Sequence, residues 1–235
     1  PTRGEAGAWV CEINATKTGA YRLTARFKLQ DDADVWHWYT ADGRRDHAVV
    51  VTPSVALSAV MYELNPLSVD ATGDDFASRS TFESLHDGNR WNLDYLTGMG
   101  ANWLWFQPIH PRGEEGRETV NGQHYDPGSP YAIGSEEGGH EAIHPELGAR
   151  EDFHHLVKAA AEHGLEIALD FAIQCSPDHP WLREHPGWFS WRPDGSIRYA
   201  ENPPKKYQDI VNVDFYAEDS LPSLWLALRD VVQGW

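Results

Sequence analysis

The hydrophobic and polar positions of the chain change their period near Ser58. Before it, apolar and polar side chains alternate, as in YRLTARFKL, where Tyr21, Leu23 and Ala25 alternate with polar neighbours. A period of two is typical of strands with one covered face, and turn-forming residues separate the stretches. We therefore predict a small β-sandwich-like flanking domain, or part of one, over residues 1–55. Its strands are expected at 8–14, 20–29, 35–40 and 47–53, with turns at 16–19 and 40–46.

From Ser58 onward, apolar runs alternate with segments of helical spacing. In the segment 150–164, apolar side chains three and four apart predict one buried helix face, formed by Phe153, Leu156, Val157, Ala160 and Ala161. A succession of strand and helix implies parallel strands joined by crossover helices. Strands are expected at 59–65, 102–111 and 165–175, and helices at 81–100, 150–164 and 218–235.

Two long segments follow the second and third predicted strands, at 111–148 and 176–216. In both an open doubly wound sheet and a (β/α)8 barrel, ligands bind at the carboxyl ends of the strands. No glycine-rich phosphate loop follows the first strand, which disfavours a nucleotide-binding sheet. We therefore predict an α/β fold over residues 56–235, the first three βα units of a (β/α)8 TIM barrel, ending before strand 4.

Composition narrows the class of partner. The formal net charge of −17 argues against nucleic acid and anionic membranes, since both are bound through basic surface. The 11 tryptophans suit either core packing or stacking on sugar rings. Cys11 and Cys175 lie far apart in sequence and lack metal-binding spacing. Two free thiols fit a reducing cytoplasm, and a single disulfide between them is the alternative.

Several long stretches of the sequence resemble a known family. The stretch ELGAREDFHHLVKAAAEHGLEIALDFAIQC resembles the region around the third strand of the α-amylase superfamily of glycoside hydrolases. GSPYAIGSEEGGHEAIHPELG, CSPDHPW and AENPPKKYQDI resemble one branch more closely, the α-1,4-glucan:maltose-1-phosphate maltosyltransferases. The resemblance covers roughly residues 60–235. It implies maltosyl transfer to α-1,4-glucan or maltooligosaccharides, maltose 1-phosphate as donor, and a homodimer.

The resemblance also implies a substrate pocket. Its family places an aspartate that organises the sugar pocket at the end of the third strand, which corresponds to Asp170, and a substrate contact at Gln174. Residues of the donor pocket correspond to Asn202, Lys205 and Tyr207. Because prolines 203 and 204 restrict the backbone, we expect 200–210 to be a rigid loop that holds these polar groups ready for a phosphate.

The loop after the second strand departs from that branch. Where the maltosyltransferases carry a basic stretch, this chain has Glu114, Glu115 and Glu118, which would repel a phosphate. Tyr125 precedes Tyr131 by six residues, a spacing that resembles the amylase loop whose first tyrosine stacks on sugar. Both features favour an α-amylase-like hydrolase of α-1,4-glucans as the alternative, with Tyr125 as a substrate-binding residue.

No catalytic residue is predicted within the chain. Retaining transfer or hydrolysis needs two carboxyl groups across the glycosidic bond, and the resembled family carries them after the fourth and fifth strands. We expect the chain to be a segment of a longer enzyme; a non-catalytic glucan-binding protein is the other possibility. No cofactor is expected, and no metal, since Gly138, Gly139 and Pro145 oppose a helix that would pair His140 with His144.

Overall fold

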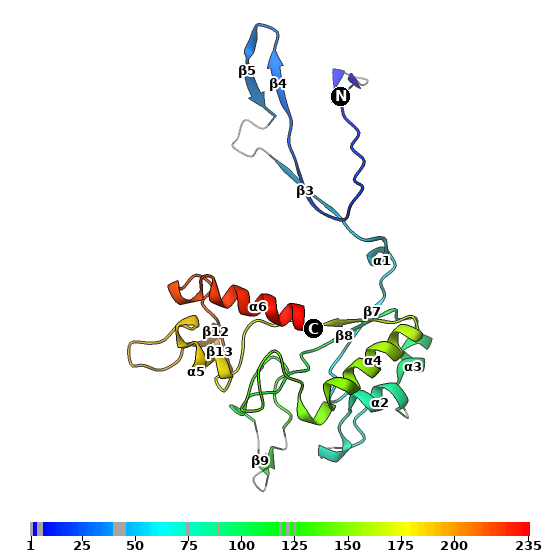
Figure 1. The fold of residues 1–235 in the computed structure, drawn as a ribbon, viewed down its shortest axis with the longest axis vertical. Helices are drawn as coiled ribbons and strands as arrows, with labels where there is room; N and C mark the ends of the chain where they lie inside the picture. The colour runs from blue at the N-terminus through cyan, green and yellow to red at the C-terminus, as the bar shows by residue number, and fades with distance from the viewer. Residues whose placement is uncertain are drawn as a thin grey trace. The chain divides into compact units, whose positions relative to one another are not determined.

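The computed structural model describes residues 2–3, 7–39, 46–73, 76–88, 90–117, 119–120, 123–124 and 126–235. Its backbone contacts divide the chain into two compact units, 1–59 and 60–235. Figure 1 labels the helices and strands of each. No helix in the described part of the chain is long and apolar enough to cross a membrane.

The unit 1–59 consists of antiparallel strand pairs. β1 pairs with β2, β3 with β6 and β4 with β5. Their bounds are Thr2–Arg3 (β1), Trp9–Val10 (β2), Gly19–Leu23 (β3), Arg26–Leu29 (β4), Asp32–Trp38 (β5) and His47–Val51 (β6), followed by the short helix α1, Ser54–Leu57. The predicted strand 20–29 is therefore two strands, and the predicted turn 40–46 lies outside the described residues except for Asp46.

The covered sheet face predicted for this unit is not seen. None of its described residues is buried, and Phe27 and Leu29 are 47% and 51% exposed. Each pair has only two strands, which are too few to bury an apolar face by themselves. The sandwich-like flanking domain over 1–55 stays a prediction.

The unit 60–235 is built on three parallel strands in the order β7-β8-β11. Their bounds are Met61–Leu64 (β7), Trp103–Phe106 (β8) and Glu166–Leu169 (β11). The predicted parallel strands are confirmed, each shorter than its apolar run. Leu64, Phe106 and Leu169 lie side by side in register, so the residues that follow them share one carboxyl edge.

Three helices lie together beside this sheet (Figure 1): α2 (Phe82–Asp87), α3 (Leu93–Gly98) and α4 (Arg150–Glu162). Short 3-10 turns, η2 (Phe76–Ser78) and η3 (Pro145–Leu147), precede α2 and α4. The core between sheet and helices includes Leu104 and Phe106 from β8, Phe82 from α2 and Phe153 and Leu156 from α4. α4 ends as predicted, with Gly164 in the left-handed region at φ 73°.

Two helix predictions need correction. The segment 81–100 forms two helices, because Gly88 is extended and the side chain of Asn92 accepts the Tyr95 N–H to start α3. On α4 the buried face is formed by Phe153, Leu156, Ala159 and Ala160, whereas Val157 is 39% exposed. The buried face is thus turned toward Ala159, and the predicted Val157 and Ala161 are both exposed.

The segment predicted as a loop at 176–216 carries regular structure. It contains α5 (Pro180–Glu184), η4 (Pro186–Trp188) and an antiparallel hairpin of β12 (Tyr199–Asn202) and β13 (Lys205–Val211). The rigid loop expected at 200–210 is therefore this hairpin, turned by Pro203 and Pro204. After η5 (Glu218–Ser220), helix α6 (Ser223–Gly234) packs Leu224 and Val231 on Val211 and Trp188 in a second core.

The long segment after β8 adds a short hairpin, β9 (Thr119–Val120) with β10 (Gln123–His124), and otherwise few regular elements. It is held by isolated bridges, among them Arg112 with Ile133 and Ser135 with Gly138. This segment therefore has backbone contacts of its own.

Candidate functional site

The carboxyl edge of the sheet gathers polar side chains from all three strands. Asn65, Gln107 and Asp170 each follow the last residue of a strand, and the strand register aligns them. Backbone hydrogen bonds continue the ladder by one step, from Gln107 N–H to Leu64 and from Asp170 N–H to Phe106. The Gln107 amide donates to Glu63 Oε1 at 3.0 Å. The edge thus presents two carboxylates and two amides.

Asp170 receives a hydrogen bond from the long segment above it. The hydroxyl of Tyr131 donates to Asp170 Oδ2 at 3.0 Å, although 39 residues separate them. Burial raises the pKa of Tyr131 to about 12, with further contributions from the Asp170 hydrogen bond and the charges of Asp170 and Glu63. The phenol therefore stays protonated at neutral pH and acts as a donor.

Such a group can bind a sugar ring. Carboxylates accept hydrogen bonds from hydroxyl groups, amides both donate and accept, and a neutral phenol donates. Phe171, next to Asp170 in sequence, is 37% exposed. Neither the Glu63 nor the Asp170 carboxylate is held by an arginine or lysine among the described ion pairs, so both can accept hydrogen bonds from a polyol.

Arg112 connects the long segment to this edge. Its guanidinium donates to the carbonyls of Pro127 and Gly128, at 3.2 and 2.9 Å, and to Asn65 Oδ1 at 3.3 Å. Arg112 is only 2% exposed, and its Nε has no hydrogen-bond partner among the described residues. One buried cation thus joins the end of β7 to the chain just before Tyr131.

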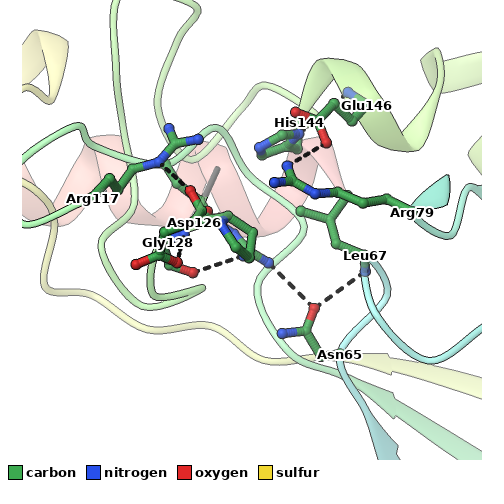
Figure 2. Close-up of polar contacts among 10 residues, drawn as sticks. Asn65, Leu67, Arg79, Arg117, Asp126, Gly128, His144 and Glu146 are labelled. Carbon is green, nitrogen blue, oxygen red and sulfur yellow. Dashed lines mark hydrogen bonds and ion pairs between the residues drawn. The ribbon is translucent and has the colours of Figure 1, made fainter. Parts of the chain in front are cut away.

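Further basic residues surround Arg112. Arg79 pairs with Glu146 at 2.6 Å, and Arg117 donates to the Asp126 carbonyl (Figure 2). Burial, then the charges of Arg117 and Arg79, lower the pKa of Arg112 to about 10, which leaves it cationic at neutral pH. Burial, and then the charges of Arg112, Arg117 and Arg79, lower the pKa of His144 to about 3, so His144 is neutral.

The β12–β13 hairpin separates its side chains onto two faces. Opposed residues share a face, so the pairs Asn202–Lys205 and Ala200–Tyr207 lie on one side. The pair Glu201–Lys206 lies on the other, where Glu201 also contacts Arg192 at 3.3 Å. The three hairpin residues predicted for the donor pocket are thus on one face, separate from Lys206, and all three are exposed.

The hairpin is attached to the segment that follows Asp170. Cys175 and Val211 exchange two backbone hydrogen bonds, of 3.2 and 2.7 Å, and both are fully buried. Gln174, partly buried, adjoins this bridge, and Tyr207 is four residues away along β13, a span of about 13 Å in an extended strand. In the described chain Asp170 shares no hydrogen bond with the hairpin side chains.

The predicted site residues therefore form two groups. Asp170 lies at the strand edge with Tyr131, while Asn202, Lys205 and Tyr207 share the hairpin face, with Gln174 between the groups in sequence. Tyr125 and Glu118 lie outside the described residues. Glu114 and Glu115 are exposed.

Sequence reasoning did not assign Glu63, Gln107, Tyr131 or Arg112 to the site. Glu63 and Gln107 lie where strands end, which is where functional residues of a barrel are found. The stretches YELN and FQP could have indicated both residues. Tyr131 and Arg112 carried no such signal. Among the described residues no three His, Cys, Asp or Glu side chains are grouped to hold a metal ion.

Comparison with known proteins assigns the family. The model of the α-amylase catalytic domain matches residues 86–226, more than half of the chain. The chain belongs to the α-amylase family. In keeping with this, the crystal structure of an α-amylase from Lactobacillus plantarum superposes with a TM-score of 0.55 and 27% identity, over 74% of this chain and 35% of that one.

Two relatives within the α-amylase family carry the name α-1,4-glucan:maltose-1-phosphate maltosyltransferase. The one from Pseudomonas aeruginosa is 61% identical over 195 residues, 81% of this chain and 28% of the relative. The one from Rhodospirillum rubrum is 48% identical over 99% of this chain and 34% of the relative. The chain spans about a third or less of the length of these relatives.

Proposed function

We propose that a full-length protein carrying this chain is an α-1,4-glucan:maltose-1-phosphate maltosyltransferase. The observation that carries the proposal is the 61% identity over 195 residues to a relative of that name. The resemblance of AENPPKKYQDI to the same branch agrees with it.

In the proposed reaction a carboxylate attacks the anomeric carbon of maltose 1-phosphate. A second carboxyl group gives its proton to the departing oxygen as the carbon–oxygen bond breaks, and inorganic phosphate leaves with the electron pair. The 4-hydroxyl of a glucan end then attacks the maltosyl ester, returns a proton to that second carboxylate, and releases the first. The proposal places both carboxylates after the fourth and fifth strands, beyond Trp235.

The residues of this chain would bind and orient the donor. Asp170 and Gln174 would contact the sugar, and Lys205 would neutralise the phosphate as a point charge. Asn202 and Tyr207 would add neutral hydrogen bonds from the same hairpin face. Tyr131, by donating to Asp170, would hold that carboxylate in place.

The architecture of the whole is part of the proposal. Residues 1–55 would belong to a flanking β-domain and 56–235 to the first three βα units of a (β/α)8 barrel. The enzyme would be a cytoplasmic homodimer, in which both thiols stay reduced; Cys11 and Cys175 are unpaired in the structure.

An α-amylase-like hydrolase is the second candidate. It is favoured by the exposed Glu114 and Glu115 after β8, where a donor phosphate would meet negative charge. Tyr125 would then stack on the sugar at the cleavage point.

One incubation series separates the candidates. Full-length protein is mixed with maltose 1-phosphate, with and without a maltooligosaccharide, and separately with starch in water. Phosphate release that depends on the acceptor, with chains growing by two glucose units, is the result expected for transfer. Reducing sugar from starch alone would identify the hydrolase. If neither reaction occurs and the full-length chain only binds glucan, the enzyme proposal is wrong.

A further inference from the structure

A directed chain of hydrogen bonds runs through two buried histidines behind the candidate site. His140 Nε2 lies 2.8 Å from the Ala172 carbonyl, which can only accept, so Nε2 carries the proton. In a neutral ring Nδ1 is then the acceptor, and it lies 3.0 Å from His179 Nε2, which must donate. His179 Nδ1 accepts the Trp181 N–H at 3.1 Å. Each histidine is thus assigned one tautomer by its partners.

Packing holds both rings in place. His140 and His179 are each 1% exposed, and the His140 ring stacks on Trp181 with centroids 5.0 Å apart and planes 17° apart. The His179 ring fits against two glycines: a Cβ at Gly134 or Gly139 would lie 2.4 or 2.3 Å from its atoms. Any larger residue at these positions would displace the ring.

The chain of hydrogen bonds joins three separate segments. His140 belongs to the long segment after β8, Ala172 follows β11, and His179 with Trp181 starts α5. Ala172 lies two residues after Asp170 and two before Gln174. We propose that His140 and His179 are positioning residues, which fix the backbone at Ala172 and thereby the placement of Asp170 and Gln174 in the sugar pocket. This inference rests on the proposed function.

The surroundings keep both histidines neutral. Burial lowers the pKa of His140 to about 4 and that of His179 to about 2. A proton added at His140 Nδ1 would face the proton on His179 Nε2, and one added at His179 Nδ1 would face the Trp181 N–H. The neighbouring His110 donates its own Nδ1 proton to the Ala142 carbonyl at 2.9 Å, and burial lowers its pKa, so it too is neutral.

Matched variants separate positioning from packing. His140→Phe keeps an aromatic ring against Trp181 but loses both hydrogen bonds, whereas His140→Gln retains a donor for the Ala172 carbonyl. His179→Asn retains an acceptor for Trp181 N–H and is too short to reach His140. His155→Phe, on the exposed side of α4, is the control.

In full-length protein we expect His140→Phe and His179→Asn each to lower kcat/KM for maltosyl transfer by about tenfold or more, since small misplacements near the reacting centre cost that much. His140→Gln should recover most of the rate, and the double variant should lose no more than either single one, because both break the same chain. Equal kcat/KM in His140→Phe and His140→Gln would overturn the proposal.

Hydrogen exchange gives a readout that needs no substrate. Peptides spanning 166–178 should exchange faster in His140→Phe and His179→Asn than in the wild type, and not in His140→Gln or His155→Phe. Unchanged exchange in both His140→Phe and His179→Asn would also overturn the proposal. If the wild type transfers no maltosyl unit, the proposed function fails. The exchange rates still decide whether His140 and His179 hold this backbone in place.

Discussion

The hydroxyl of Tyr131 donates a 3.0 Å hydrogen bond to Asp170 Oδ2, and so ties the long segment after β8 to the end of β11. Arg112 makes a second tie, from the chain just before Tyr131 to Asn65 after β7. Together they hold an irregular segment against the carboxyl edge of the sheet. In a barrel this edge is the working face.

Removal of the Tyr131 hydroxyl tests the hydrogen bond to Asp170. Tyr131→Phe should lower kcat/KM of the full-length enzyme by about tenfold, since Asp170 loses a hydrogen bond of the strength seen for charged groups. Steady-state kinetics with maltose 1-phosphate measure this. Tyr95→Phe on α3, whose ring is 46% exposed, is the control and should behave as wild type. Full activity in Tyr131→Phe would remove Tyr131 from the site.

The two lysines of the hairpin should differ. Lys205 shares a face with Asn202 and Tyr207, while Lys206 lies opposite beside Glu201. Lys205→Met should raise KM for maltose 1-phosphate by about tenfold or more, because a phosphate loses its counter-charge. Lys206→Met is the matched control and should stay close to wild type. Equal effects of the two changes would contradict the assignment of the donor face.

Arg112 should be essential for stability in a way that lysine cannot replace. A lysine has one ammonium group and cannot reach Asn65 and the Gly128 carbonyl together. Arg112→Lys should reduce the free energy of unfolding by about 2 kcal/mol, the scale of lost hydrogen bonds to a charged group. Urea unfolding gives the value. Arg229→Lys, in an exposed pair with Asp230, is the control, and a similar small change in both variants would refute the role of Arg112.

Stability should fall on the acid side of neutrality. The pKa values of His140, His144 and His179 are lowered by burial to about 4, 3 and 2. An unfolded histidine has a pKa of about 6.5, so between about pH 6.5 and 4 the unfolded state binds more protons and is favoured. Above about pH 7 these groups are neutral in both states and have no effect.

Thermal melting at several pH values checks this prediction. The melting temperature of the wild type should decline steadily below about pH 6.5, and His140→Gln should show a shallower decline because it lacks one such group. An identical slope in variant and wild type would show that His140 does not contribute.

Local patterns were sufficient for the regular part of the larger unit. Apolar runs predicted β7, β8 and β11, and their alternation with helical spacing predicted a parallel sheet. The helix over 150–164 and its end at Gly164 followed from side-chain period and backbone freedom, which depend on near neighbours in the chain. Asp170 was assigned from a family resemblance in the same stretch.

Other features depended on partners distant in sequence. Prolines 203 and 204 suggested a loop, but the strands on either side pair because Val211 is anchored to Cys175 and packed under α6. Gln107 and Glu63 meet only because β7 and β8 lie in register, 44 residues apart. Tyr131 reaches Asp170 across 39 residues.

The sequence by itself thus determined the three parallel strands, the helix over 150–164 and the family that the strand ends resemble, since periodicity and motif are local properties. Only the tertiary structure decided which polar groups meet. Strand register, and the buried hydrogen bonds of Arg112, His140 and His179, bring together side chains that are far apart in sequence. Nothing in the local pattern of the chain indicates these contacts.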